Sequence, residues 1–209
     1  MDVLLSTAYL PPICYISECI HPEKILIEAF DTYAKQTCRN HCNIYGPNGK
    51  QTLSIPVHRI NGNHTLVKDV RISYSLPWQK IHWKSIETAY NKSPFFLFYR
   101  DYLELFFLTK HDFLIDLNTK LLDSIFRILR IDKEVGFTGY FEKQPEDIKD
   151  NRHILVSKFS PLPKLFPEYT QVFGTRYGFL PNLSIIDLIF NLGPGALDYL
   201  NDFPAIYKD

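Results

Sequence analysis

The sequence lacks a net charge, a basic leader segment and any long apolar run. Its 23 basic residues balance 23 acidic ones, so no overall field would steer the chain to nucleic acid or to an anionic membrane. No Lys or Arg precedes Lys24, so the basic start of a signal peptide is missing. No apolar stretch reaches the about 18 residues of a spanning helix. We expect a cytoplasmic protein without a membrane span or a nucleic-acid partner.

The sequence also lacks the common motifs of catalysis and metal binding. It has no G-x-G-x-x-G, P-loop, G-x-S-x-G, H-E-x-x-H or paired C-x-x-C, which are the signatures of nucleotide, serine-hydrolase and zinc sites. Cys14, Cys19, Cys38 and Cys42 are spaced unlike a zinc knuckle. We expect reduced, mostly buried thiols and no metal, with a zinc site beside His41 or disulfides as alternatives. The sequence identifies no cofactor.

The composition is that of a folded protein. Of the 209 residues 45% are apolar and 15% aromatic, against 22% charged, which is enough to fill a substantial core. No repeat or low-complexity linker divides the chain. We therefore predict a single domain over residues 1–209.

The first 30 residues predict a βαβ unit. Apolar runs at residues 2–8 and 24–30 are typical of buried strands, and the stretch Ile13–Ile20 between them, bounded by Pro12 and Pro22, is typical of a helix. Such a unit is expected to be parallel with a right-handed crossover. Ligand sites of parallel sheets lie at the carboxyl ends of the strands.

The rest of the chain predicts a hairpin followed by helices. Two alternating runs flank the turn at residues 46–49, and residues 67–74 alternate like a third strand. Helical periodicity begins at Pro77, resumes in residues 95–107 and 116–131, and returns at 177–192, where Gly193 would end the helix. Residues 136–171 look irregular, with one strand at 153–159. The predicted fold is α/β: a short mixed sheet, an N-terminal βαβ unit, a β-hairpin and a helical C-terminal half.

Polar residues follow both strands of the predicted βαβ unit. Ser6, Thr7 and Tyr9 end the first strand, where they could meet a ligand or simply cap a helix. The second strand is followed by a dense set of acids, amides and cations, which suit an anionic or carbohydrate-like ligand unless their charges pair among themselves in a solvated loop. This set comprises Asp31, Tyr33, Lys35, Gln36, Arg39 and Asn40.

His82 lies on the apolar face of the helix after Pro77, between Trp78 and Trp83. A histidine in such a position is either a satisfied core residue or a proton-transfer group. Trp78, one helical turn earlier, could form the floor of a sugar or nucleobase pocket.

A polar stripe runs along the most apolar predicted helix. Ser184, Asp187 and Asn191 recur at i, i+3 and i+7 within a segment that is otherwise apolar. Burying the Asp187 carboxylate costs several kcal/mol unless partners are supplied. Together with Asn118, the stripe faces either an internal polar network or a functional cleft.

Taken in order, these motifs resemble the WbqC-like protein family, named after a protein of bacterial O-antigen gene clusters. Members often lie near polysaccharide genes, so the resemblance implies acyl or aminoacyl transfer to a sugar. This chain resembles the short Bacteroidota form, because it lacks a Gly-containing insertion before the Tyr169-x-Gln171 motif, and it has His41 where relatives commonly have Arg. The resemblance extends through Tyr9–Pro12, Tyr33–Gln36, Arg39-Asn40, Gly46–Gly49, Leu53–Val57, Trp78–Ile86, Tyr90–Phe96, Asp116–Asn118, Tyr169–Phe173 and Asn182–Pro194.

Two hypotheses follow. In the first, the protein is a transferase acting on a sugar or acyl donor in envelope polysaccharide synthesis, and His82 or Asp187 handles the proton. In the second, it is a non-catalytic module that binds a small ligand or scaffolds a partner, and an exposed aromatic patch could form a homodimer. The candidate binding residues are Tyr9, Asp31, Lys35, Gln36, Arg39, Asn40, Trp78, Asn118, Ser184 and Asn191.

Overall fold

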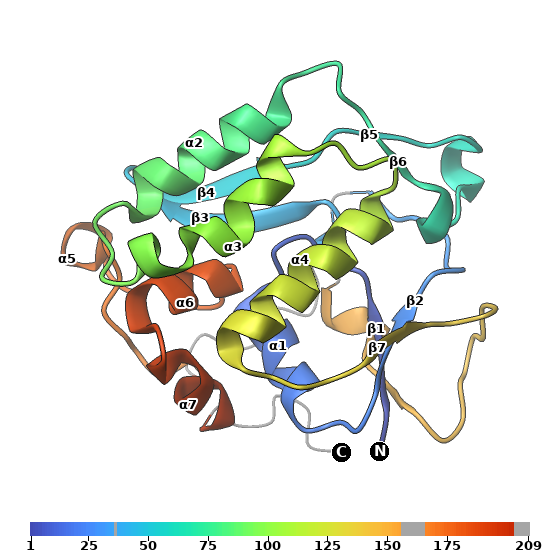
Figure 1. The fold of residues 1–209 in the computed structure, drawn as a ribbon. Helices are drawn as coiled ribbons and strands as arrows, with labels where there is room; N and C mark the ends of the chain where they lie inside the picture. Colours follow the sequence, from blue (N-terminus) through green and yellow to red (C-terminus); the bar gives the residue numbers. More distant parts are fainter. Residues whose placement is uncertain (36, 156–165, 203–209) are drawn as a thin grey trace.

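A four-stranded parallel sheet lies at one end of the molecule in the computed structural model, which describes residues 1–35, 37–155 and 166–202 (Figure 1). Its order is β7-β2-β1-β8, and all neighbouring strands are parallel. In register, Val3 pairs with Ile25 and Ser6 with Glu28. The strands are β1 (Val3–Ser6), β2 (Ile25–Glu28), β7 (Val135–Phe137) and β8 (Lys149–Asp150).

The predicted βαβ unit is confirmed. Helix α1 (Ile13–Ile20) connects the parallel strands β1 and β2, and its bounds match the prediction. Pro12 precedes the helix, where a fixed φ is tolerated, and Pro22 follows its end, because a proline cannot continue a helix. Ile13, Ile16 and Cys19 of α1 are fully buried, so the crossover forms part of the core.

The predicted hairpin is also confirmed. β3 (His41–Gly46) and β4 (Gly49–Ser54) are antiparallel, and Gly46 pairs with Gly49 across the two-residue turn Pro47-Asn48. Gly49 has a φ of +98°, which an L side chain rarely adopts. The predicted parallel and antiparallel strands are therefore both present, but in separate sheets.

The strand predicted at residues 67–74 is wrong in its first half. η2 (Val67–Asp69) is a 3-10 turn, because the backbone N–H groups of Val67 and Lys68 donate to the loop after β2 instead of to a strand. Only β6 (Arg71–Ile72) is extended, and it pairs with β5 (Val57–His58). A further 3-10 turn, η1, covers Gly62–His64.

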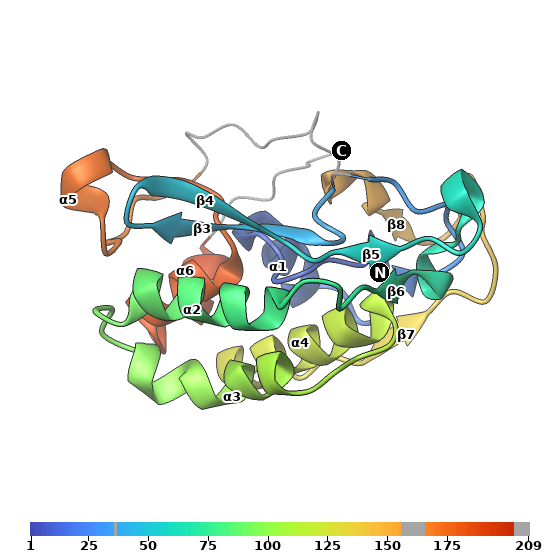
Figure 2. The same ribbon diagram turned by 90° about the horizontal axis from the view of Figure 1, so that it is seen from above.

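The three central helices follow the predicted periodicity. They are α2 (Trp78–Tyr90), α3 (Phe96–Leu108) and α4 (Leu114–Leu129). Figure 2 shows them on one side of the β3–β4 hairpin, while the parallel sheet and α5 lie at opposite ends of the molecule. The strongly amphipathic α4 buries Asn118 together with Leu121, Leu122, Ile125 and Leu129, as its sequence predicts.

The helix predicted at residues 177–192 is wrong in its first half. The segment contains the last residue of α5 (Gly174–Tyr177) and all of α6 (Ile185–Leu192), while the residues between them are not helical. Gly178 and Asn182 both have positive φ, which breaks a right-handed helix.

The predicted stop at Gly193 is confirmed. Gly193 has a φ of +56°, and a Cβ there would lie 2.5 Å from the Phe95 ring, so only glycine fits. The chain then continues into α7 (Gly195–Asn201).

The region interpreted as irregular contains two strands that the sequence did not reveal. β7 and β8 have three and two residues, too few to give a hydrophobic period. The strand predicted at residues 153–159 is wrong where it can be compared, because its first residues belong to η3 (Arg152–Leu155). Its remainder lies outside the described residues.

One hydrophobic core joins the inner face of the sheet to α1, α4 and α6. The four cysteines are free thiols, and burial raises the pKa of each. Within the described ranges, no helix has the length and apolar character that crossing a membrane requires.

Candidate functional site

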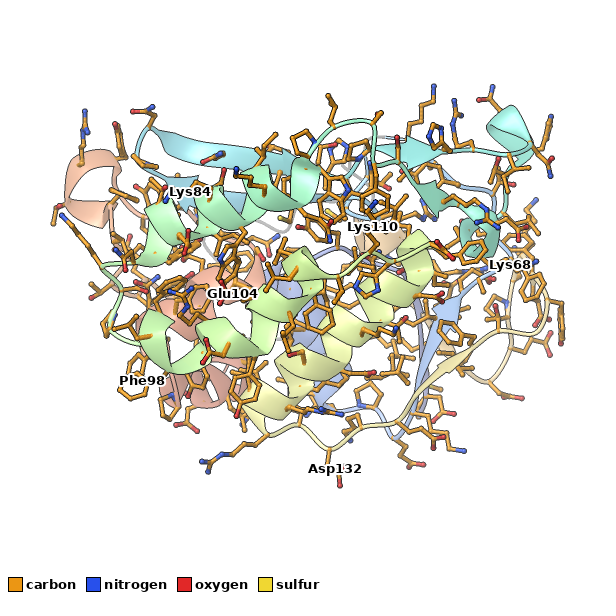
Figure 3. The ribbon with its side chains drawn as sticks, turned by 45° about the horizontal axis from the view of Figure 1, so that its top comes forward. Lys68, Lys84, Phe98, Glu104, Lys110 and Asp132 are labelled. Atoms are coloured by element: carbon orange, nitrogen blue, oxygen red, sulfur yellow. The ribbon has the colours of Figure 1, made fainter. Side chains whose placement is uncertain are left out.

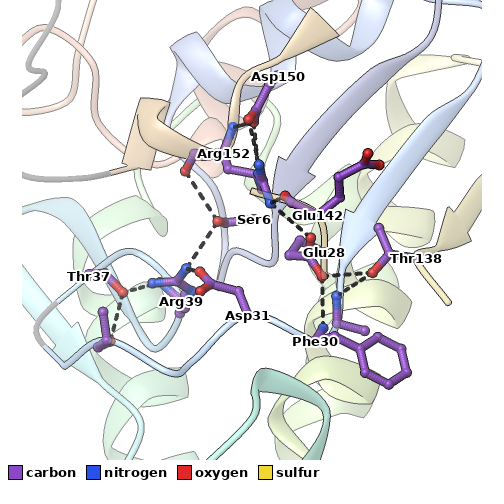
Figure 4. Close-up of polar contacts among 12 residues, drawn as sticks. Ser6, Glu28, Phe30, Asp31, Thr37, Arg39, Thr138, Glu142, Asp150 and Arg152 are labelled. Atoms are coloured by element: carbon purple, nitrogen blue, oxygen red, sulfur yellow. Dashed lines mark hydrogen bonds and ion pairs between the residues drawn. The ribbon is translucent and has the colours of Figure 1, made fainter. Parts of the chain in front are cut away.

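Polar side chains gather where the parallel strands end, as the βαβ topology predicts (Figure 4). Ser6 ends β1, Glu28 ends β2, and Asp150 ends β8. Thr138 follows β7, while Asp31 and Arg39 belong to the loop after β2. The resulting edge cluster consists of Ser6, Glu28, Asp31, Arg39, Thr138, Asp150 and Arg152.

Arg39 is the most unusual member of the edge cluster. Its side chain is only 7% exposed, and burial lowers its pKa, opposed by the nearby Asp31. Its Nη2 donates to Asp31 Oδ2 at 2.8 Å and to Ser6 Oγ at 3.2 Å. Its Nε has no hydrogen-bond partner in the part of the chain that the structure describes. A buried donor without a partner is costly, so this atom marks a place for an additional acceptor.

Glu28 and Arg152 form the second ion pair of the edge cluster. Glu28 is 1% exposed, and its Oε2 lies 3.1 Å from Arg152 Nη1. Its Oε1 accepts hydrogen bonds from Thr138 Oγ1 and from the backbone of Phe30, each at 2.8 Å. Both carboxylate oxygens therefore have partners, as a buried charge requires.

Arg152 also holds Asp150 and the loop that covers the sheet edge. Its Nη2 lies 2.6 Å from Asp150 Oδ2, and its Nη1 donates to the carbonyl oxygen of Glu142. Burial alone would raise the pKa of Asp150, but the hydrogen bonds and charge of Arg152 lower it. Those same contacts raise the pKa of Arg152, so both groups stay charged.

Ser6 connects the two arginines. Its hydroxyl donates to the carbonyl oxygen of Arg152 and accepts from Arg39, both at 3.2 Å. The edge cluster thus contains two guanidinium groups and three carboxylates, and each guanidinium is already paired. The arrangement has no spare cation for an anionic ligand, but it can hydrogen-bond to neutral polar groups.

Two amides extend the edge cluster inward. Asn118 Nδ2 donates to Thr7 Oγ1 at 3.1 Å and to the carbonyl oxygen of Arg39 at 2.8 Å. Asn40 Nδ2 donates to the carbonyl oxygen of Ile55. The Oδ1 atoms of both amides are buried without a partner among the described residues. Together with Arg39 Nε, the Arg39-Asn40 segment has one unpaired donor and two unpaired acceptors around it.

A cavity of about 310 Å³ opens beside Glu28. This size lies at the lower end of ligand pockets in proteins. Leu4 and Leu26 of the sheet line it together with the loop that joins β7 to β8. The remaining lining residues are Glu28, Phe137, Thr138, Gly139, Tyr140, Glu142, Pro145, Glu146 and Ile148.

His82 and Tyr9 form a pair inside the core. His82 Nδ1 lies 2.9 Å from the Tyr9 hydroxyl, and both residues are buried. Burial lowers the pKa of His82 to about 4, opposed by a hydrogen bond with the Ser54 backbone, so its ring is neutral at pH 7. Trp78 packs edge-on against His82 at 5.2 Å and is itself buried. The backbone N–H of Tyr9 donates to the carbonyl oxygen of Cys38, the residue before Arg39 of the edge cluster.

Asp187 lies in a separate buried network. The carboxylate is 0% exposed, and its Oδ2 accepts from Tyr169 Oη at 2.6 Å and from Gln171 Nε2 at 2.8 Å. Burial raises its pKa, opposed by hydrogen bonds from Tyr169, Gln171 and Tyr90. We call these four residues the Asp187 network. Among the described residues, no hydrogen bond joins Asp187 to Arg39 or His82.

The other two residues of the polar stripe hold backbone. Ser184 Oγ donates to the carbonyl oxygen of Leu10, which has a positive φ of 40° and needs such support. Asn191 Nδ2 donates to the carbonyl oxygen of Asp187, one turn earlier in α6. Of the predicted site residues, the structure therefore brings Asp31, Arg39 and Asn118 together, but places Ser184, Asp187 and Asn191 elsewhere. Lys35 is exposed, and Gln36 lies outside the described residues.

Sequence reasoning missed four members of the edge cluster: Glu28, Thr138, Asp150 and Arg152. Glu28 left a signal, since it is a charged residue at the end of the apolar run Ile25-Leu26-Ile27. The other three lie in the region interpreted as irregular, where the short strands gave no period.

The N-terminus of α1 is closed to an anion. Ile13 N–H donates to Leu183 O at 3.0 Å, and Cys14 N–H donates to Asn182 Oδ1 at 3.1 Å. These amides are the ones that bind phosphate at helix N-termini in other proteins. In the described part of the chain, no three His, Cys, Asp or Glu side chains are grouped as a metal site would need.

The fold and the edge cluster define an α/β protein with a polar site at the carboxyl edge of a parallel sheet. The model of the WbqC-like protein family matches residues 7–160, and this chain belongs to that family. The matched range contains Glu28, Arg39 and Arg152 and ends before Asp187. The chain is 25% identical over 227 residues to "Uncharacterized protein Rv1507c" of Mycobacterium tuberculosis, covering 94% of this chain and 96% of the relative. No solved structure matches.

Proposed function

We propose that the carboxyl edge of the parallel sheet binds a neutral, hydroxyl-bearing small molecule, such as a sugar. The observation that carries this proposal is Arg39, which is almost fully buried at the strand ends with Nε left unpaired. A hydroxyl group both donates and accepts hydrogen bonds. It therefore matches an edge where Arg39 Nε lacks an acceptor and where Asn40 and Asn118 each retain a free amide oxygen.

The charge of the edge cluster supports a neutral ligand over an anionic one. Arg39 is paired with Asp31, and Arg152 with Glu28 and Asp150. A phosphate or carboxylate would have to displace a carboxylate from a guanidinium or add to a net negative cluster. If the protein also binds an acyl donor, the negatively charged part of that donor would lie outside the edge cluster.

The reaction we propose is transfer of an acyl or aminoacyl group to a sugar in the synthesis of envelope polysaccharide, in the cytoplasm. The chain belongs to the WbqC-like family through residues 7–160, and this reaction class is what the resemblance to that family implies, since the family takes its name from a protein of O-antigen gene clusters. Solvent reaches two carboxylates of the edge cluster, Asp31 with a side chain that is 30% exposed and Asp150 with one that is 32% exposed. We assign Asp31, Arg39 and Asn40 to binding of the polar ligand. We assign the exposed Lys35 to the surface from which the ligand enters the site.

His82 and Asp187 have structural roles in this proposal. Both are buried and lie outside the edge cluster, so neither is placed to transfer a proton to a ligand bound there. The same holds for Tyr9, Trp78, Ser184 and Asn191, which pack or hold backbone. Asp187 Oδ2 accepts from Tyr169 and Gln171, while its Oδ1 has no hydrogen-bond partner among the described residues.

The second candidate function is a non-catalytic module that binds the same ligand. The observation that favours it is the burial of both proton-transfer candidates, His82 and Asp187. Incubating the protein with an acyl donor and a sugar, followed by mass spectrometry, separates the two functions. An acylated sugar supports the transferase, and binding without product supports the module.

The binding site is tested by thermal shift with free sugars, nucleotide-sugars, acyl-carrier thioesters and aminoacyl donors. A sugar or nucleotide-sugar present at about 100 times its Kd should stabilise the wild type by roughly 2.7 kcal/mol, which is a rise in Tm of several degrees. Arg39→Lys keeps the charge but removes Nε and the planar fork, so it should abolish the rise. Arg176→Lys is the matched control, because Arg176 is exposed on α5 at the opposite end of the molecule. A full rise with Arg39→Lys, or none with any hydroxyl-bearing ligand, contradicts the proposal.

A further inference from the structure

Helix α3 exposes a row of large apolar side chains, with the exposed Asp101 on the same face. Leu97, Phe98, Tyr102, Leu105 and Leu108 are each between 50% and 72% exposed, and we call them the α3 ridge. The opposite face of the same helix is buried through Phe96, Leu103 and Phe107. Figure 3 shows Phe98 at the outer edge of the molecule. Scattered exposed apolar residues are ordinary, but five on one face of a helix form a patch, here shared with one charged residue, Asp101.

The area of the α3 ridge is that of an interface core. Aromatic side chains present on the order of 150–250 Å² each, and with the same range applied to the leucines the exposed fractions leave roughly 500–800 Å² of mostly apolar surface. Monomeric proteins rarely expose more than a few hundred Å² in one patch. A stable interface buries about 800 Å² on each partner, of which the ridge would supply the larger part.

A groove of about 520 Å³ lies beside the ridge, between α3 and α4. Tyr102 and Leu105 belong to both the ridge and the groove, so the two features are continuous. The groove is bordered by both signs of charge, Asp101 and Asp123 against Lys120 and Arg127. A surface that contains a ridge, a groove and both charges can complement itself.

We propose that the α3 ridge is the interface of a homodimer, formed by a second copy of this chain about a two-fold axis near Tyr102. A two-fold interface requires self-complementarity, because every residue meets the partner from both sides. The ridge residues are distributed almost symmetrically about Tyr102, with Leu97 and Phe98 before it and Leu105 and Leu108 after it. Two antiparallel α3 helices therefore place Phe98 against Leu105 of the second copy and bring the two Tyr102 side chains together at the axis. Asp101 lies beside this axis, in the lining of the groove that also contains Lys120 and Arg127.

The dimer is tested by sedimentation velocity of the full chain. The wild type should sediment at twice the 24.5 kDa chain mass at 10 µM protein. The double variant Phe98→Glu/Leu105→Glu places charges in the ridge and should weaken dimerisation at least 100-fold without changing the circular dichroism. Ile60→Glu is the matched control, because Ile60 is 61% exposed outside the ridge, and it should remain dimeric.

The position of the axis is tested by cross-linking. Under mild oxidation, Tyr102→Cys should form an intermolecular disulfide with its copy, whereas Ile60→Cys should not. A monomeric wild type at 100 µM, or a dimer that the double variant leaves intact, overturns the proposal. A monomer whose ridge instead binds neutral or anionic lipid vesicles overturns it as well.

Discussion

The edge cluster and the Asp187 network both remove carboxylates from water, but only the edge cluster supplies cations. Glu28 and Asp150 share Arg152, and Asp31 is bound by Arg39. Asp187 is held only by neutral donors, two of which are Tyr169 and Gln171.

The difference shows in the pKa values. Arg152 lowers the pKa of Asp150 against the effect of burial, whereas burial raises the pKa of Asp187 because hydroxyl and amide donors compensate only in part. Paired charges at a strand edge can thus remain ionised and meet a ligand, and a lone carboxylate in a core cannot. Burial of a polar group is therefore a weak sign of function unless the group also lies at a position where ligands bind in that fold, such as the carboxyl edge of a parallel sheet.

The largest expected effect is that of Arg152→Ala in the edge cluster. It leaves Glu28, which is 1% exposed, as an unpaired buried charge, so the free energy of unfolding should fall by about 3–5 kcal/mol. Urea unfolding at pH 7 measures this. The double variant Glu28→Gln/Arg152→Gln removes both charges and should recover much of the loss, while Arg176→Ala should change little. A loss below about 1 kcal/mol would mean that water reaches Glu28.

The next effect is the pH dependence contributed by His82. Its pKa is about 4 in the folded protein against an ordinary 6.5, so the unfolded chain binds the proton first as pH falls. This stabilising contribution is complete above pH 6.5 and is lost as pH falls through 6.5 to about 4, which amounts to about 3 kcal/mol. Urea unfolding measures the decrease in the free energy of unfolding between pH 7 and pH 4. This decrease should be smaller for His82→Gln than for the wild type. His58→Gln, at an exposed site, should show the same decrease as the wild type. Equal losses for His82→Gln and the wild type would place His82 in contact with solvent.

Asp187→Asn should lower the free energy of unfolding less, by about 2 kcal/mol at pH 4. Its amide oxygen can accept from both Tyr169 and Gln171, which now donate to the one oxygen Oδ2, but its Nδ2 would be buried without an acceptor where Oδ1 now lacks a partner among the described residues. The folded-state pKa of Asp187 is raised, so its stabilisation is fully present below pH 3.8 and is lost as pH rises through the raised pKa. The advantage of the wild type over Asp187→Asn should therefore shrink as pH rises. Asp132→Asn, at an exposed position, is the control for urea unfolding. If Asp187→Asn also abolishes a ligand-induced thermal shift, the separation of the two networks is wrong.

The smallest expected effect is that of Ser6→Ala, about 1 kcal/mol. The two hydrogen bonds of the Ser6 hydroxyl, to Arg39 and to the backbone of Arg152, are both long at 3.2 Å. Differential scanning calorimetry at pH 7 measures the change. Ser17→Ala removes one local hydroxyl-to-backbone bond on α1 and serves as the comparison. A cost above about 3 kcal/mol would show that Ser6 holds the two arginines together.

The elements with strong local patterns could be predicted from the sequence. The helix Ile13–Ile20 lies between prolines, the hairpin turns through Pro47-Asn48 directly before Gly49, and α4 carries a clear amphipathic period. The strands β7 and β8 could not be predicted, because their few residues join the sheet through pairing with β2 and β1 and not through any pattern of their own.

The candidate site also has a part that the sequence predicts and a part that it does not. The βαβ unit placed Asp31 and Arg39 at the carboxyl edge from sequence alone, since parallel strands end together. The polar stripe of α6 was equally visible in sequence, but its neighbours were not. Tyr169 and Gln171, which lie 18 and 16 residues before Asp187 in the chain, reach it only because the intervening segment folds back.

The sequence by itself determined the family, the βαβ start and the need of Asp187 for buried partners, because these depend on residue order and local periodicity. Only the tertiary structure decided that Asp187 and Arg39 belong to different networks. The partners of a buried charge come from segments distant in sequence, and periodicity within a helix specifies which face is polar but not what lies opposite that face.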